Sequence, residues 1–161
     1  MIEISNIFKS FSGNEILKDL SITFEKGKTN LVIGQSGSGK TVLLKCLLGL
    51  HAPEKGSIVY GGLDIVGKSN KNLKQLRRQI GMVFQGGALF DSMNVEENIL
   101  FPLQMFSNDN QSEMLDRVNF CLKRVNLENV NHLFPSEISG GMKKRVAIAR
   151  AVLKNAPILI L

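Results

Sequence analysis

Cysteine is scarce in this sequence, and so is histidine, which often binds metals together with cysteine. The 161 residues include two cysteines, Cys46 and Cys121, and neither has a Cys or His neighbour at the spacing of metal ligands. This excludes a cysteine-based metal site. We therefore predict that both thiols pack in the interior as small hydrophobic side chains.

Long hydrophobic runs are also absent. The longest apolar stretches, residues 42–50 and 158–161, are far shorter than the roughly 18 residues that a membrane-spanning helix needs. The first four residues show no basic segment followed by an apolar one, so we expect no secretory signal. The sequence therefore predicts a cytoplasmic protein that reaches a membrane only through a partner.

The remaining composition is that of an ordinary globular domain, with 43% hydrophobic and 21% charged residues. The length suits one domain with its own core. A net charge of +6 can indicate nucleic acid or a membrane surface, but the basic residues are scattered apart from 68–78 and 143–145. We expect a solvated surface and no nucleic-acid partner.

Apolar residues alternate or cluster in several short stretches, a pattern typical of β-strands. The predicted strands cover residues 2–8, 21–24, 29–33, 80–84 and 158–161. Turn residues occupy 12–14 and 26–27, and two glycines within 57–65 predict a β-hairpin. The run at 158–161 is entirely apolar, which predicts a central strand buried on both faces of a parallel sheet.

Three stretches carry helical patterns. Residues 42–50 are apolar almost all round, so we expect a helix buried on most sides. Residues 114–125 and 142–153 repeat apolar side chains at three- and four-residue spacing, which predicts amphipathic helices.

A glycine-rich segment lies between the predicted strand at 29–33 and the predicted helix at 42–50. It matches the pattern G-x-x-x-x-G-K-[ST], and its residues are Gly34, Gln35, Ser36, Gly37, Ser38, Gly39, Lys40 and Thr41. Glycines let backbone N–H groups turn toward a phosphate, and the following helix directs its positive end at the same anion. In such a loop the lysine contacts the β- and γ-phosphates and the threonine hydroxyl binds Mg²⁺.

A chance glycine-rich turn is the alternative. The four fixed positions recur by accident at only about one in 10⁴ to 10⁵ starting points, so the motif and its context favour nucleotide binding. The motif does not distinguish kinases, GTPases, helicases and transport ATPases. Residues 70–73 lack the Asp of the Asn-Lys-x-Asp element found in guanine-specific enzymes, which weakens the GTPase interpretation.

A second candidate anion site opens the predicted helix at 142–153. Ser139, Gly140 and Gly141 precede Met142, so a hydroxyl and glycine backbone donors converge on a helix N-terminus. Taken alone, this pattern also describes an ordinary helix N-cap.

The wider sequence decides between the two. Residues 135–151 resemble the signature region of ABC transporter ATP-binding subunits, and residues 81–85 resemble the Q-loop of that family. The resemblance covers the chain from end to end. It implies an α/β P-loop NTPase of ABC type, with a mixed β-sheet core, an N-terminal antiparallel β subdomain and an α-helical subdomain.

The resemblance also implies a division of the chain. One ABC ATP-binding domain, residues 1–161, would comprise the β subdomain and P-loop core over about 1–90 and the helical subdomain over about 91–140. The signature helix and the start of the Walker B strand would occupy about 141–161.

Roles for individual residues follow from the same resemblance. The family's ligands are ATP and Mg²⁺. Lys40 and Gln85 match catalytic positions, Thr41 and Gln85 match metal-binding positions, and Phe11 matches the aromatic residue that stacks on adenine. A core phenylalanine is the alternative for Phe11. Ser139, Gly140 and Gly141 would contact ATP in trans, in a head-to-tail homodimer of ATP-binding subunits.

The implied function is that of an ABC-type transport ATPase, peripheral on the inner face of the cell membrane through transmembrane permease subunits. Met142 stands where the family usually has glutamine, and together with residues 85–95 it resembles the branch that transports phospholipid or related envelope lipids. Two alternatives stay open. They are a non-transport ABC ATPase acting on ribosomes or DNA, and a non-catalytic nucleotide-binding module.

In the resembling family an Asp for Mg²⁺ and a general-base Glu follow the strand that matches residues 158–161. Neither is part of this sequence, which also leaves the core sheet incomplete. We therefore expect this chain alone to bind ATP and to hydrolyse it poorly.

Overall fold

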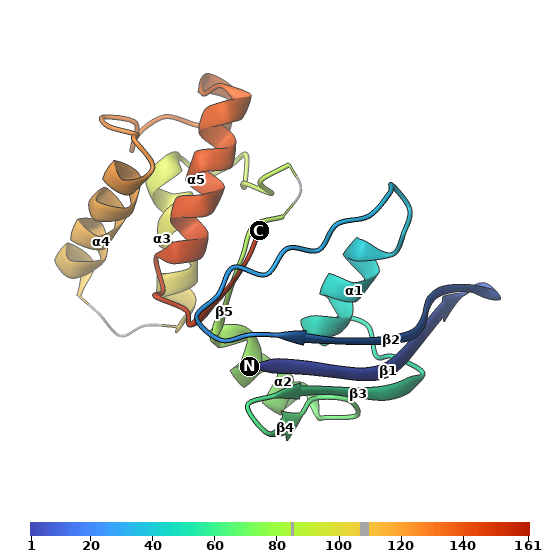
Figure 1. The fold of residues 1–161 in the computed structure, drawn as a ribbon. Helices are drawn as coiled ribbons and strands as arrows, with labels where there is room; N and C mark the ends of the chain where they lie inside the picture. Colours follow the sequence, from blue (N-terminus) through green and yellow to red (C-terminus); the bar gives the residue numbers. More distant parts are fainter. Residues whose placement is uncertain (85, 107–109) are drawn as a thin grey trace. The chain divides into compact units, whose positions relative to one another are not determined.

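The computed structural model describes residues 1–84, 86–106 and 110–161. Its helices and strands belong to two compact units (Figure 1). Unit 1 is Met1–Arg77 and unit 2 is Arg78–Leu161. None of the helices among the described residues is long and apolar enough to cross a membrane.

An antiparallel sheet of four strands forms the body of unit 1. Its strands are β1 (Ile2–Phe11), β2 (Asn14–Phe24), β3 (Lys55–Tyr60) and β4 (Leu63–Asp64), in the order β2-β1-β3-β4. Ser12 and Gly13, both with positive φ, make the tight turn between β1 and β2. The hairpin predicted over 57–65 is confirmed as β3 and β4, and the strands predicted at 2–8 and 21–24 are parts of the longer β1 and β2.

Two helices complete unit 1. Figure 1 shows α1 (Lys40–Leu47) over one face of the sheet, where it buries Leu43, Cys46 and Leu47. Helix α2 (Asn70–Arg78) supports the end of α1, because the Arg77 guanidinium donates hydrogen bonds of 2.8 Å to the carbonyls of Leu48 and Gly49. The predicted burial of Cys46 is confirmed, and burial raises the pKa of its thiol.

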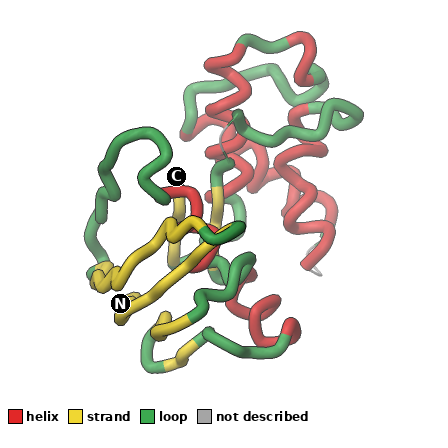
Figure 2. Tube along the Cα trace, turned by 90° about the vertical axis from the view of Figure 1, so that its right-hand side faces the viewer, coloured by secondary structure: helices red, strands yellow, loops and turns green. Residues whose placement is uncertain are grey.

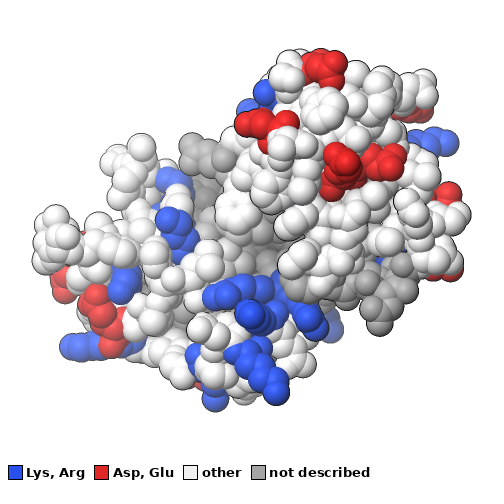
Figure 3. All heavy atoms as spheres, turned by 180° about the vertical axis from the view of Figure 1, so that it is seen from behind, with Lys and Arg blue, Asp and Glu red and all other residues white. Residues whose placement is uncertain are grey.

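The exposed side of α2 is basic. Leu73 and Leu76 face the interior, whereas Lys71 and Lys74 are exposed, and the helix contains no acidic residue. Figure 3 shows Lys and Arg side chains gathered in the lower centre of the view, over this helix.

The strand predicted at 29–33 is wrong. The whole stretch from Glu25 to Gly39 is loop and turn (Figure 2), and Leu31 and Ile33 are 83% and 81% exposed. A strand needs a hydrogen-bonded neighbour, and among the described residues no strand pairs with this segment.

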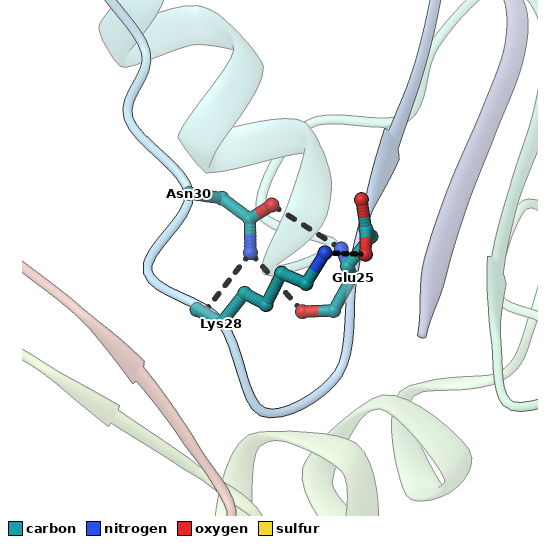
Figure 4. Close-up of polar contacts among 3 residues, drawn as sticks. All are labelled: Glu25, Lys28 and Asn30. Atoms are coloured by element: carbon teal, nitrogen blue, oxygen red, sulfur yellow. Dashed lines mark hydrogen bonds and ion pairs between the residues drawn. The ribbon is translucent and has the colours of Figure 1, made fainter.

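Local hydrogen bonds hold the start of that segment in a turn instead. The Asn30 side chain accepts from the Glu25 N–H at 3.2 Å and donates to the carbonyls of Glu25 and Lys28 at 3.1 and 3.2 Å (Figure 4). Lys28 and Glu25 also form an ion pair at 2.6 Å. Side-chain bonds of this kind compete with strand pairing.

Three helices form the core of unit 2 and pack on one another (Figure 1). They are α3 (Val95–Phe106), α4 (Gln111–Arg124) and α5 (Gly140–Val152), with the short 3₁₀ helix η1 (Pro135–Glu137) before α5. The amphipathic helices predicted at 114–125 and 142–153 are confirmed as α4 and α5. The fully buried residues in the core between these helices include Ile99, Val118 and Val146. Cys121 lies in this core, as predicted.

A pair of parallel strands, β5 (Ile80–Met82) and β6 (Ile158–Ile160), lies beside α5. A Cβ atom added to Gly81 would overlap the carbonyl oxygen of Ala151, which shows how closely β5 approaches that helix. The prediction that 158–161 is buried on both faces is wrong, because Leu159 and Leu161 are 43% and 74% exposed. Among the described residues, β6 has a strand partner on one edge only.

Asn98 is the one buried polar residue among the described residues of the chain, and it is fully inaccessible. Its side-chain amide accepts from the Phe90 N–H at 2.8 Å. The same amide donates to the carbonyls of Phe90, Met93 and Asn94 at 2.9–3.0 Å. The side chain therefore fixes the loop that enters α3.

Replacing Asn98 with Ala leaves these buried backbone groups unpaired. We expect Asn98→Ala to lower the free energy of unfolding by about 2–4 kcal/mol, measured by urea denaturation. Asn72→Ala is the matched control, since Asn72 is exposed on α2, and it is expected to cost less than about 0.5 kcal/mol. Equal losses for the two variants would contradict this role of Asn98.

Candidate functional site

The glycine-rich segment 34–41 forms an exposed loop that runs directly into α1. The Ser38 N–H donates to the Gln35 carbonyl at 3.2 Å, which closes a turn. Gly37 and Gly39 have φ of 79° and 90°, a conformation that favours glycine. Residues 34–38 are exposed, so the loop is open to an anion from solvent.

The Lys40 side chain folds back over this loop. Its ammonium donates to the carbonyls of Gly34 and Gln35 at 2.7 Å each and lies 3.5 Å from the Ser38 hydroxyl oxygen. The first turn of α1 contains no acidic residue. A full positive charge and the positive end of a helix therefore lie at one exposed loop, which suits a polyanion such as a triphosphate.

Gly39 sets the position of the loop against β2. A Cβ atom at this glycine would lie 3.1 Å from side-chain atoms of both Ile16 and Leu17 and 3.2 Å from the Ile16 carbonyl oxygen. The backbone of residue 39 can approach β2 this closely only because it has no side chain.

Thr41 is exposed in the first turn of α1, beside Lys40. Among the described residues no three His, Cys, Asp or Glu side chains converge on a possible metal site. A single hydroxyl ligand still fits Mg²⁺, because this ion commonly takes one or two protein oxygens and completes its shell with phosphate oxygens and water.

Phe11 ends β1 in the same unit and is 40% exposed, so its ring is accessible for stacking. The His51 ring meets it in a T-shaped contact with centroids 5.2 Å apart, and the Lys9 ammonium lies 5.2 Å from its centroid. The match to adenine-stacking residues did not indicate these neighbours. The stacking role of Phe11 stays a prediction.

Ser139, Gly140 and Gly141 lie at the N-terminus of α5 in unit 2 and are exposed. The Ser139 hydroxyl oxygen accepts the Met142 N–H at 3.2 Å, which confirms the N-cap. Neither glycine would meet a clash if it carried a Cβ, so this helix end is open. Contact with ATP in trans stays a prediction. The metal-binding and catalytic assignments to Gln85 lie outside the described residues.

The basic residues of α5 have a role that periodicity did not reveal. Arg150 donates to the carbonyls of Gly87 and Ala88 at 2.7 and 2.9 Å, and Arg145 donates to the Asn126 carbonyl at 2.9 Å. Burial lowers the pKa of Arg150. These arginines tie neighbouring loops to the helix that carries the signature residues.

A mainly apolar pocket of about 360 Å³ opens beside Arg150 in unit 2. It lies next to the loop that follows β5. Its lining residues are Ile80, Gly81, Met82, Phe84, Ala88, Phe90, Phe101, Pro102, Arg150, Ala151 and Lys154.

Comparison with known sequences shows a match of residues 17–161 to the family model described as "ABC transporter". The chain is 42% identical over 159 residues to the probable ribonucleotide transport ATP-binding protein mkl of Mycobacterium tuberculosis, covering 99% of this chain and 44% of that protein. It is 40% identical over 160 residues to the methionine import ATP-binding protein MetN of Clostridium acetobutylicum, covering 99% and 50%. The chain thus spans about half the length of these curated relatives.

Solved structures agree on the fold. The dimeric ATP-binding cassette MJ0796 in a post-hydrolysis state, bound to ADP and Pi, superposes with a TM-score of 0.90 at 31% identity, covering 99% of this chain and 72% of that one. CbiO1 of Clostridium perfringens superposes with a TM-score of 0.87 at 28% identity, covering 99% and 64%. The α/β fold class inferred from the motifs is confirmed.

Replacing Gly39 with alanine should destabilise the protein more than replacing Gly37 with alanine. Both positions require a positive φ, which costs a residue other than glycine about 1–2 kcal/mol. Only at Gly39 does the new Cβ also press on β2, so we expect Gly39→Ala to lose about 1–3 kcal/mol more than Gly37→Ala in urea unfolding. Equal losses would show that the approach to β2 is not tightly packed.

Proposed function

Since the chain belongs to the ABC transporter family of ATP-binding domains, we propose that it binds ATP with Mg²⁺ at residues 34–41 and, in its complete protein, hydrolyses ATP to drive transport. The observation that carries this proposal is the Lys40 ammonium, held inside an exposed glycine-rich loop at the N-terminus of α1. Binding energy at such a loop comes from charge-assisted hydrogen bonds to phosphate.

The Lys40 ammonium is held within the loop by the carbonyls of Gly34 and Gln35. When ATP enters, the ammonium exchanges these carbonyls for oxygens of the β- and γ-phosphates, and the loop amides donate to the same anion. Thr41 would supply a hydroxyl ligand for Mg²⁺, which would neutralise part of the phosphate charge. Phe11 provides an exposed ring for the adenine.

The open N-terminus of α5 supports a shared site. Ser139 uses a lone pair for the Met142 N–H and keeps its own proton to donate, and Gly140 and Gly141 leave their backbone accessible. We assign these residues to the γ-phosphate bound by a second copy of the chain, in a symmetric head-to-tail dimer. A dimeric relative bound to ADP and Pi supports this arrangement. By resemblance, Gln85 orients Mg²⁺ and the attacking water.

The pocket in unit 2 suits contact with a membrane partner. Phe84 and Phe90 line it and are 47% and 41% exposed, and residues on both sides of Gln85 contribute to it. An apolar segment of a transmembrane permease subunit would cover these rings. Such contact would hold the protein at the inner face of the cell membrane.

For cargo, we propose a phospholipid or related envelope lipid. Met142 and the sequence of residues 85–95 support this branch. The relatives named above carry ribonucleotide and methionine transport in their names, so cargo needs a direct test.

Lys40→Ala tests nucleotide binding. Loss of a charged hydrogen-bond donor to phosphate removes about 1.5–3 kcal/mol, so the Kd for ATP with Mg²⁺ should rise roughly 10- to 150-fold in isothermal titration calorimetry. Lys45→Ala is the control, because Lys45 is an exposed lysine near the other end of α1 and its loss should leave the Kd unchanged. An unchanged Kd in Lys40→Ala would overturn the proposed site.

Mass spectrometry of the purified transporter tests the cargo. The full protein, isolated with its permease subunits in detergent, should carry co-purified phospholipid. The amount of phospholipid should exceed that bound to an unrelated membrane protein taken through the same detergent exchange. Co-purification of methionine or a ribonucleotide in place of lipid would contradict the lipid assignment while leaving the ATP site intact.

A further inference from the structure

Glu54 lies in the segment between α1 and β3 and forms hydrogen bonds with the end of β1. Its carboxylate accepts the Ser10 N–H at 2.9 Å through one oxygen and the Ser10 hydroxyl at 3.1 Å through the other. The Glu54 N–H donates to the Phe8 carbonyl at 2.8 Å. Backbone and side chain of one residue therefore fix the chain immediately before Phe11.

Lys9 links this carboxylate to the Phe11 ring. Its ammonium lies 3.5 Å from a Glu54 carboxylate oxygen and 5.2 Å from the ring centroid, and the Lys9 side chain is only 17% exposed. A cation held over an aromatic face at this distance is attracted by the ring. Lys9 thus occupies one face of Phe11 and is itself held by Glu54.

The His51 ring contacts the Phe11 ring as well and limits its rotation. Its ring plane makes an angle of 69° with that of Phe11, a T-shaped contact that restricts rotation. Phe11 nevertheless remains 40% exposed. The ring is therefore held in one orientation while part of it stays accessible.

The charge on Glu54 is secured at neutral pH. Hydrogen bonding from the Ser10 N–H lowers the pKa of this carboxyl, and the Ser10 hydroxyl and the Lys9 charge lower it further. Glu54 is accordingly an anion under the conditions in which ATP binds, and it can hold the Lys9 ammonium.

We propose that Glu54 and Lys9 are positioning residues that orient Phe11 so that the exposed part of its ring receives the purine base of a nucleoside triphosphate. This inference rests on the proposed ATP site, in which Phe11 receives the adenine, and adds the residues that orient its ring. A ring already held in its binding orientation loses less conformational entropy when the base stacks on it. The side-chain contacts of Glu54 and Lys9 are with Ser10, with Phe11 and with each other, so we expect their effect to be confined to ligands that carry a base.

Glu54→Gln tests the proposal with two probes, ATP and inorganic tripolyphosphate, each titrated with Mg²⁺. The amide keeps the size of the side chain but loses the charge that holds Lys9. We expect the Kd for ATP to rise about three- to tenfold and the Kd for tripolyphosphate to stay unchanged. Lys9→Met, which removes the cation and keeps an unbranched chain, should show the same split between the two probes.

A double-mutant cycle separates positioning from a direct contact. In a Phe11→Ala background, Glu54→Gln should cause no further loss of ATP affinity, because the ring that it orients is absent. Glu25→Gln is the matched control, since it removes the carboxylate of another exposed Glu–Lys pair in unit 1 and should change neither Kd.

Four outcomes would overturn the inference. They are an unchanged ATP affinity in Glu54→Gln, equal losses for both probes, an undiminished effect of Glu54→Gln without Phe11, and a Phe11→Ala variant that binds ATP like the unaltered chain. In the last case, retained tripolyphosphate binding would leave the phosphate site standing. Failure of the unaltered chain to bind either probe would overturn the proposed function and this inference together.

Discussion

The close approach of Gly39 to β2 is the contact on which the nucleotide site depends. Because this residue has no side chain, the start of α1 lies against Ile16 and Leu17, and the loop before it turns through a positive φ. That geometry brings the Lys40 ammonium back to the carbonyls of Gly34 and Gln35. The same strand pairs with β1, which ends at Phe11, so one hairpin supports both the phosphate loop and the aromatic ring.

Charge is distributed differently over the two parts of the proposed nucleotide site. The phosphate loop combines a lysine with a helix N-terminus that carries no nearby acid. At Phe11 the lysine is neutralised by Glu54 instead, so it packs on a ring without offering a second anion site. Lys40 and Lys9 are thus proposed to differ in function, because Lys40 faces backbone carbonyls, which a phosphate can replace, and Lys9 faces a carboxylate.

Sequence patterns predicted the features that depend on local chemistry. The glycine-rich loop before α1, the Ser139 cap and the amphipathic helices α4 and α5 all follow from residue type and spacing, and the structure contains each of them. The strand predicted at 29–33 failed because strand formation requires a partner, and a short apolar run carries no information about whether a partner is present.

Contacts between distant residues were also beyond the sequence patterns. The hydrogen bonds of Glu54 to Ser10 join residues 44 positions apart, and those of Arg150 to Gly87 join residues 63 apart. The sequence patterns did not single out Asn98, yet its buried side chain holds the loop before α3 through hydrogen bonds. In each case at least one partner is a backbone group, which has no signature in the sequence.

Each unit contains one buried cysteine, and chemical modification of its thiol can report on the opening of that unit. Cys46 lies in the core of unit 1 and Cys121 in that of unit 2, and burial raises the thiol pKa of both. A thiol reagent reaches such a side chain only when the surrounding structure opens, so the modification rate at each cysteine measures the opening of its own unit. Comparing the two modification rates with and without nucleotide therefore shows whether nucleotide binding stabilises unit 1 alone or both units.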